Sequence, residues 1–172
     1  MKVLIVSDSH GLNKELDIII NRHSNEVDAM IHCGDSERDA DSQEMLNFIT
    51  VRGNCDFDEN YPLEQVKEIK NVSFYITHGH LYNVKLSLLN LKYRAEEVGA
   101  SVVCFGHSHI AGAELIDGIL FINPGSIRLP RLRNEKTYAI IEIDETLICT
   151  VHFYNSQDGS EINSLKGLFK IG

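Results

Sequence analysis

Short apolar runs separated by polar turns dominate the chain. Each run has the length of a β-strand and is rich in Val, Ile, Leu, Phe and Tyr. The runs are KVLIVS, AMIHC, NFITVR, VSFYITH, SVVCFGH, AELID, GILFIN, TYAIIEI and ICTVHFY. Several contain an uninterrupted apolar stretch, such as VLIV, which is typical of strands buried on both faces. The pattern therefore predicts sheets in the interior of the protein.

Two segments, residues 12–23 and 84–98, have apolar residues at helical spacing. The apolar positions are Leu16, Ile19 and Ile20 in the first segment and Leu88, Leu91 and Ala95 in the second. Strand and helix alternate over the first two thirds of the chain, whereas residues 111–154 are nearly all strand, with turns at Asp-Gly and Asp-Glu-Thr. This order implies a mixed α/β fold, with two sheets packed together and helices outside.

Size and charge narrow the class of protein. The chain has 172 residues, of which 43% are hydrophobic and 24% charged, so we expect one soluble domain over residues 1–172. Its net charge of −9 argues against general binding to a nucleic-acid backbone, which normally requires a basic surface. A phosphate site in such a protein would need a metal ion.

The cysteines and the apolar runs indicate where the protein works. Cys33, Cys55, Cys104 and Cys149 form no CxxC pair, so neither a zinc ribbon nor a disulfide framework is expected. No run approaches the ~18 residues of a membrane span, and the opening VLIV is too short for a signal peptide. We therefore expect a cytoplasmic protein without a membrane segment.

Polar residues of one chemical kind follow five successive strands, as SDSH, HCGDS, RGNCD, THGH and GHSH. Ligands of open α/β sheets bind beyond the carboxyl ends of parallel strands, so residues distant in sequence can converge there. Ordinary turn and helix-cap chemistry is the competing interpretation, because Asp, Asn and Ser favour such positions without any metal. The residues expected to face one crevice are Asp8, His10, Asp35, Asn54, His78, His107 and His109.

Carboxylate oxygens, an amide oxygen and imidazoles suit Mn, Fe, Co, Ni or Zn better than an all-oxygen calcium site. Seven donors are more than one tetrahedral ion requires. Two ions that share a carboxylate would use all of them, as in two-metal hydrolases. Asp35, in the middle of the set, is the natural bridge.

The ordered set DSH, GDS, GNCD, HGH and GHSH, from Asp8 to the NPGS at residues 123–126, resembles the calcineurin-like metallophosphoesterase superfamily. Within it, the chain is similar to the small YfcE-type phosphodiesterases of bacteria and archaea. The resemblance implies a four-layer α/β/β/α sandwich of two mixed sheets flanked by helices. It also implies a phosphodiesterase with two divalent ions per chain, Mn²⁺ being expected and Ni²⁺, Co²⁺, Fe²⁺ or Zn²⁺ the alternatives. The mechanism that the resemblance implies is in-line attack on phosphorus by a hydroxide between the ions.

The resemblance also distributes the donors between the ions. It assigns one ion to Asp8, His10, Asp35 and His109 and the other to Asp35, Asn54, His78 and His107. THGH offers two imidazoles, of which the family spacing favours His78 as the ligand and leaves His80 facing the substrate or supporting a ligand. Arg128, in the loop after NPGS, is a candidate for holding a phosphate oxygen, the alternatives being a solvated loop or a subunit contact.

Cys55 stands where many members of the superfamily have a histidine that contacts the transition state or protonates the leaving group. A thiol, with a pKa near ~8.5 and weak hydrogen bonding, is a poorer partner for a departing alkoxide. We therefore expect a preference for leaving groups that need little protonation. The candidate catalytic residues are Asp35, Asn54, Cys55 and His80. Asp56 is expected to accept hydrogen bonds in a turn or in support of a metal ligand rather than to act as a catalytic acid.

The expected substrate is a small phosphoester, and a homodimer or homotetramer is compatible with the sequence. The alternative function is a non-catalytic protein-interaction scaffold on the same fold, like the retromer subunit, which resembles this family but has degraded metal ligands. Every ligand position in the present chain keeps a competent donor. This favours the enzyme.

Overall fold

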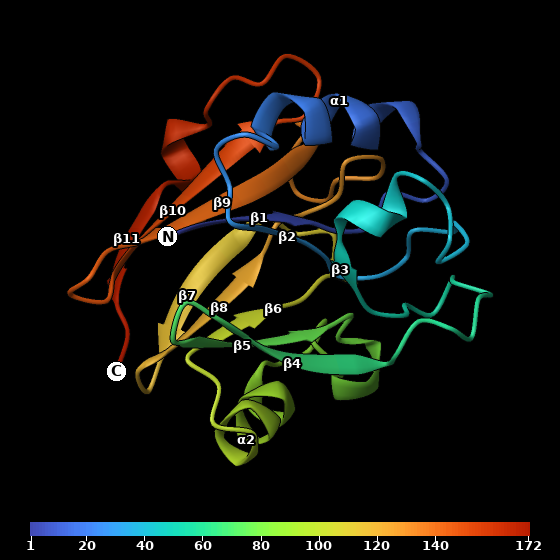
Figure 1. Ribbon diagram of the computed structural model, residues 1–172. Coiled ribbons are helices and arrows are strands. Elements are labelled where there is room, and N and C mark those ends of the chain that lie inside the picture. Colours follow the sequence, from blue (N-terminus) through green and yellow to red (C-terminus); the bar gives the residue numbers. More distant parts are fainter.

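The computed structural model describes residues 1–172 and contains two mixed β-sheets stacked on one another (Figure 1). The first sheet has the strand order β11-β10-β9-β1-β2-β3 and the second the order β4-β5-β6-β8-β7. The strands of the first sheet are β1 (Lys2–Val6), β2 (Ala29–His32), β3 (Ile49–Thr50), β9 (Thr137–Ile143), β10 (Ile148–Asn155) and β11 (Gly167–Lys170). Those of the second are β4 (Glu64–Ile69), β5 (Val72–Thr77), β6 (Val102–Cys104), β7 (Gly112–Ile116) and β8 (Ile119–Asn123).

Each sheet has a helix on its outer face (Figure 1). Helix α1 (Lys14–His23) packs on the first sheet and helix α2 (Leu89–Glu97) on the second. Short 3₁₀ turns occur at η1 (Met45–Asn47), η2 (His80–Tyr82) and η3 (Asn163–Leu165). No helix is long and apolar enough to span a bilayer.

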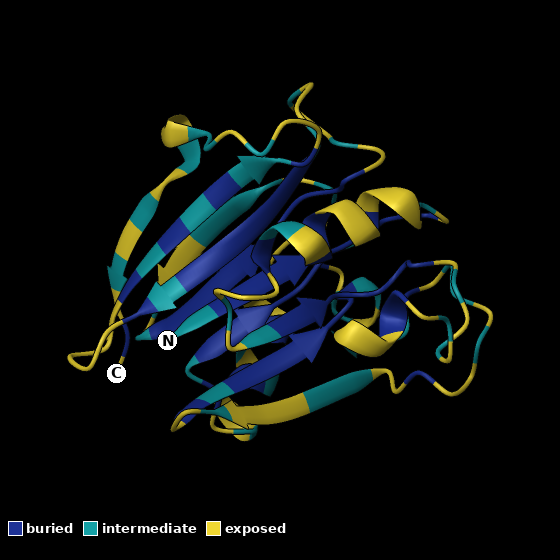
Figure 2. Cartoon of the chain, turned by 45° about the horizontal axis from the view of Figure 1, so that its top comes forward, coloured by how far each residue is buried: buried dark blue, intermediate teal, exposed yellow.

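Three apolar clusters correspond to the three interfaces between the layers. In β1, Val3 and Ile5 point into the cluster between the sheets, whereas Leu4 and Val6 contact the cluster beneath α1. Successive side chains of a strand point to opposite faces of the sheet. Because both faces of this sheet contact an apolar layer, successive residues of the strand are apolar. The central strands of both sheets are accordingly buried along their length (Figure 2). The four-layer α/β/β/α prediction is confirmed.

The parallel strands of both sheets direct their carboxyl ends to one region. β1, β2 and β3 are parallel neighbours in the first sheet, and β5, β6 and β8 are parallel neighbours in the second. The remaining pairs are antiparallel, and they include the hairpin of β7 and β8, joined through Asp117 and Gly118, both with positive φ. This arrangement creates the shared edge at which the polar strand ends meet.

All the predicted strands form, but two observed strands were not predicted. β4 has the sequence EQVKEI and lies at a sheet edge, where charged side chains remain exposed, so no apolar run marks it. β11 lies in the polar tail, pairs with β10 and forms an edge of the first sheet. Helix α2 begins at Leu89 rather than at residue 84, because Asn83 has a left-handed backbone and turns occupy the residues that follow.

Candidate metal centre

The polar residues that follow β1, β2, β3, β5 and β6 surround one site at the carboxyl ends of both sheets. Asp8 and His10 come after β1 and Asp35 after β2, whereas His78 directly follows β5 in the other sheet. The sequence predicted a crevice at the end of parallel strands. The structure adds that the crevice joins the ends of two sheets.

Five of the predicted ligand residues have a left-handed backbone. The φ angles are 54° at Asp8, 45° at His10, 54° at Asp35, 65° at His107 and 59° at His109. This conformation is uncommon for residues other than glycine and costs free energy, and such residues cluster at functional sites. A set of ordinary turns would not require the same cost at so many donor residues.

Two glycines allow the backbone to approach the carboxylates. A Cβ atom added at Gly53 would overlap Asp35 Oδ1, and one added at Gly106 would lie 2.6 Å from Asp8 Oδ2. The glycine of RGNCD therefore does more than end a strand. It makes room for the carboxylate of Asp35.

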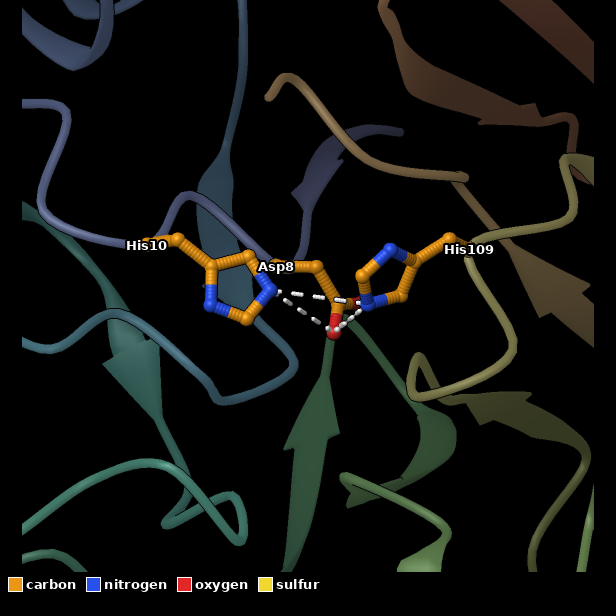
Figure 3. A group of neighbouring side chains, drawn as sticks. All are labelled: Asp8, His10 and His109. Carbon is orange, nitrogen blue, oxygen red and sulfur yellow. Dashed lines mark hydrogen bonds and ion pairs between the residues drawn. The ribbon is translucent and has the colours of Figure 1, made fainter. Parts of the chain in front are cut away.

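Asp8, His10 and His109 form the first group of donor atoms, shown in Figure 3. His109 Nε2 lies 3.0 Å from Asp8 Oδ1, His10 Nε2 lies 4.0 Å from the same oxygen, and the two Nε2 atoms are 3.5 Å apart. The three side chains come from the loops after β1 and β6, so both sheets contribute. The group has the donors and the spacing to hold one metal ion.

Asp8, Asp35 and His78 form a second group next to the first. His78 Nε2 lies 3.3 Å from Asp35 Oδ2 and 3.9 Å from Asp8 Oδ1. Asp35 also groups with His10 and Cys55, so each of the two carboxylates has neighbours from both expected ligand sets. The remaining oxygens are engaged elsewhere, since Asp8 Oδ2 accepts from Ser7 Oγ and Asp35 Oδ1 accepts from the Cys55 N–H.

The imidazoles are held with Nε2 toward the carboxylates. His78 Nδ1 donates to the carbonyl of Cys33 at 2.8 Å, and His109 Nδ1 donates to the carbonyl of Leu129 at 2.7 Å. A carbonyl can only accept, so both Nδ1 atoms carry the proton and both Nε2 atoms are free to bind a metal. His10 Nδ1 contacts Glu37 Oε1 at 2.7 Å, which orients the third ring in the same way.

Two atoms at the centre are buried without a hydrogen-bond partner, Asp8 Oδ1 and His78 Nε2. Buried polar atoms are nearly always partnered, because desolvating them costs free energy that a hydrogen bond must offset. An acceptor oxygen and an imidazole nitrogen that face one another unpaired are the donors a divalent ion would use. The residues present therefore fit a metal ion.

The electrostatic field of the site favours positive charge at His78. Burial opposes a charge on this ring, but the carboxylates of Asp35 and Asp8 outweigh burial and raise the pKa of His78. Burial also opposes charge on Asp35, but His78 and the N–H of Cys55 outweigh it and lower the pKa of that carboxyl. Burial, followed by the neighbouring His78, lowers the pKa of His107 to about 4, so this ring is in the neutral form that ligates metals.

A family model described as the calcineurin-like phosphoesterase superfamily domain matches residues 1–146. The chain belongs to this superfamily. It is 51% identical over 166 residues to a Bacillus subtilis (strain 168) protein named "Probable metallophosphoesterase YsnB", covering 96% of the present chain and 97% of the relative. It is 32% identical over 106 residues to "Phosphodiesterase YfcE" of Escherichia coli K12, covering 56% and 53% of the two chains.

Solved structures of other proteins share the phosphoesterase fold. A Streptococcus pneumoniae TIGR4 protein described as a predicted phosphoesterase is 36% identical, with a TM-score of 0.93 over 98% of the present chain and 96% of the other. Vps29 from Entamoeba histolytica, crystallised with Zn²⁺, is 19% identical with a TM-score of 0.74 over 98% of each chain. At that identity the likeness to Vps29 shows the fold alone.

The remaining predicted site residues lie around the two groups of donor atoms. The centroid of the His78 ring lies 5.1 Å from that of His107 and 5.3 Å from that of His80. Asn54 is exposed and donates through Nδ2 to Cys55 Sγ at 3.3 Å, so its amide oxygen is not used in this bond. Arg128 donates through Nη1 to the carbonyl of His10.

Asp56 organises the loops that carry Asp35 and Asn54, two of the predicted metal ligands. Its carboxylate accepts from the N–H groups of Asp35 at 2.8 Å, Glu37 at 2.7 Å and Gly53 at 2.7 Å, and from Ser36 Oγ at 3.0 Å. The prediction that Asp56 is a hydrogen-bond acceptor is confirmed, and three of these four donors lie in the loop after β2. The sequence analysis missed Glu37, because nothing in the spacing of GDSE indicates that this carboxylate reaches His10.

Asp56→Ala is expected to destabilise the fold by about 2–4 kcal/mol, because it leaves several N–H groups without their charged acceptor. Urea unfolding followed by circular dichroism measures the change as a lower midpoint. Asp58→Ala is the matched control, since Asp58 accepts only from the N–H groups of Ala40 and Asn60 and should cost less. Equal midpoints for the two variants would show that Asp56 does not hold the loops together.

Proposed function

We propose that the protein is a phosphodiesterase that uses two divalent metal ions. The observation that carries the proposal is the pair of buried, unpartnered atoms, Asp8 Oδ1 and His78 Nε2, among imidazoles whose Nε2 atoms face the same point. The relative named phosphodiesterase YfcE supports a diester rather than a monoester as substrate. The complete donor set argues against the alternative of a non-catalytic scaffold.

The donors divide between two ions in this proposal. Asp8, His10, Asp35 and His109 would hold one ion, and Asp35, Asn54, His78 and His107 the other, with Asp35 as the bridge. The mixture of nitrogen and oxygen donors suits Mn²⁺, with Ni²⁺, Co²⁺, Fe²⁺ and Zn²⁺ as alternatives. When bound, the ions would polarise the phosphoryl oxygens and lower the pKa of bound water toward neutrality.

Side chains around the ions would position the substrate. Arg128 uses Nη1 for the carbonyl of His10, which leaves its other N–H donors for a phosphate oxygen. His80 Nδ1 is buried and has no hydrogen-bond partner, and burial followed by the charge of His78 lowers the pKa of the ring. We assign Arg128 to phosphate binding and His80 to contact with the substrate.

All four cysteines are free thiols, which accords with a place for this enzyme in the reducing cytoplasm. Cys33, Cys104 and Cys149 are fully buried in the cluster between the sheets, as small apolar residues. Cys55 alone is partly exposed beside the metal centre. Burial and the charge of Asp35 raise its pKa to about 12, so Cys55 is a neutral thiol at neutral pH.

Cys55→Ala is therefore expected to retain aryl phosphodiester cleavage within about tenfold of the parent, a loss below ~1.4 kcal/mol of transition-state stabilisation. The N–H of residue 55, which holds Asp35 Oδ1 at 2.7 Å, is kept in this variant. Steady-state kcat/KM with bis(p-nitrophenyl) phosphate gives the result. A thousandfold loss with both ions still bound would make the thiol an essential catalytic group.

The proposed function is tested with protein that has been stripped of metal and reloaded with one ion at a time. The substrates are a panel of phosphomonoesters, phosphodiesters and cyclic nucleotides. The proposal expects diester cleavage that returns with Mn²⁺ or a similar ion and remains absent with Ca²⁺. Failure of every reloaded form to cleave any ester in the panel would refute it.

A further inference from the structure

A cavity of about 670 Å³ is lined in part by Ser108, which belongs to the loop that carries His107 and His109. Its apolar wall includes Val84, Phe105, Ile110 and Phe121, and two cations, Lys85 and Arg131, also line it. Organic ligands bind in cavities of roughly 300–1,000 Å³ that are mainly apolar with a few polar groups. The cavity has the size and the lining of a ligand site, and the proposed metal chemistry does not use it.

The cavity and the candidate metal centre border the same loop. Ser108, which lines the cavity, stands between His107 and His109 in the chain. Asn123 Nδ2 donates to Ser108 Oγ and to the carbonyl of Gly106, each at 2.9 Å, and so fixes the loop. Consecutive Cα atoms are about 3.8 Å apart, so the backbone of Ser108, at the edge of the cavity, is next to that of both histidines.

The charge of the cavity differs from that of the whole protein. The chain has a net charge of −9, yet Lys85 and Arg131 both line this cavity. The N–H of Arg131 donates to the carbonyl of His109 at 3.0 Å, so its backbone is fixed beside the metal centre. A single carboxylate, Glu114, also lines the cavity. The cations favour a ligand with negative charge at the end near the histidines.

We propose that this cavity binds an aromatic ring of the substrate while the phosphoryl group lies at the metal centre. The inference rests on the proposed function and names the class of ester that the site prefers. A cavity of about 150 Å³ is enough for benzene, so the volume accommodates a ring and the atoms that link it to phosphorus. Burial of an aromatic ring against apolar side chains supplies the binding free energy.

The test compares phenylphosphonate with methylphosphonate, which are not hydrolysed, on the Mn²⁺-loaded protein by calorimetry. The wild type is expected to bind phenylphosphonate at least tenfold more tightly. Gly112→Leu fills the cavity, because a Cβ atom added at Gly112 meets no atom within 4 Å. This variant should bind the two ligands within twofold of each other. Leu115→Phe, on the same strand but outside the cavity, should keep the wild-type preference.

Thermal unfolding and metal content verify that each variant is folded and loaded. If Gly112→Leu does not fold, Gly112→Ala is used, with an expected loss of about threefold in the preference. Equal binding of the two phosphonates by the wild type, or an unchanged preference in the folded Gly112 variant, would overturn the inference. So would a wild-type dimer that Gly112→Leu converts to a monomer with the phosphonate preference intact, since the cavity would then be a subunit interface.

The same measurements separate this inference from the proposed function. Loaded protein that cleaves diesters but does not discriminate between the phosphonates retains the proposed function and loses the aromatic site. Loaded protein that discriminates between the phosphonates but cleaves no ester retains the binding site and loses the proposed function.

Discussion

Asp35→Asn is expected to reduce kcat/KM for an aryl phosphodiester by at least about 10³-fold. Changes to residues that only support a metal ligand typically cost 10–100-fold in metal affinity or activity, so the loss of a bridging charge should exceed that range. The substitution keeps the size of the side chain and its bond from the N–H of Cys55 at 2.7 Å. The loss therefore reports the charge of Asp35 rather than a change of shape.

The control for this variant is Asp58→Asn, which removes a negative charge from the next loop without touching the donor groups. Its kcat/KM should stay within about twofold of the parent. Asp8→Asn is the informative comparison, because Asp8 also has neighbours from both ligand sets. If Asp8→Asn released both ions and Asp35→Asn released one, the bridge would be Asp8 and our assignment of Asp35 would be wrong.

Removal of metal is expected to lower the thermal unfolding midpoint by about 10–20 °C. An ion present at 100 times its dissociation constant stabilises a protein by ~2.7 kcal/mol, so two ions contribute roughly 5 kcal/mol. For a chain of 150–250 residues, 1 kcal/mol corresponds to about 2–4 °C. Calorimetry with and without a chelator gives the shift, and it needs no substrate.

Asp35→Asn again serves as the comparison, since a protein that holds its ions weakly should show a much smaller shift on chelation. Reloading with Mn²⁺ should restore the wild-type midpoint, which excludes irreversible damage by the chelator. A midpoint that chelation leaves unchanged, in protein shown by elemental analysis to have lost its metal, would mean that the ions do not stabilise these loops.

The central strands could be predicted because packing between layers imposes a visible pattern. Val3 and Ile5 fill one interface and Leu4 and Val6 the next, so residues 3–6 of β1 are all apolar. β4 and β11 lie at sheet edges, where one long side is exposed and the chain is free to carry Lys and Glu. The sequence therefore indicates the interior of each sheet better than its borders.

The residue types of the candidate site could also be predicted, but their contacts could not. Asp, Asn and His at successive strand ends indicate a site, because parallel strands bring their carboxyl ends together. Glu37 meets His10, and the carbonyls of Cys33 and Leu129 hold His78 and His109, through contacts between distant parts of the chain. The cavity lined by Phe105 and Phe121 likewise arises from four separate segments, whose meeting no single stretch of sequence indicates.

The number of ions per chain tests the central claim most directly. Protein stripped of metal, reloaded with Mn²⁺ and freed of excess ion is analysed for metal and for protein concentration. We predict two ions per chain in the wild type, weaker binding of both in Asp35→Asn, and the loss of mainly one ion in His109→Ala and the other in Asn54→Ala. A single tightly held ion that is unaffected by Asp35→Asn would contradict the two-metal site.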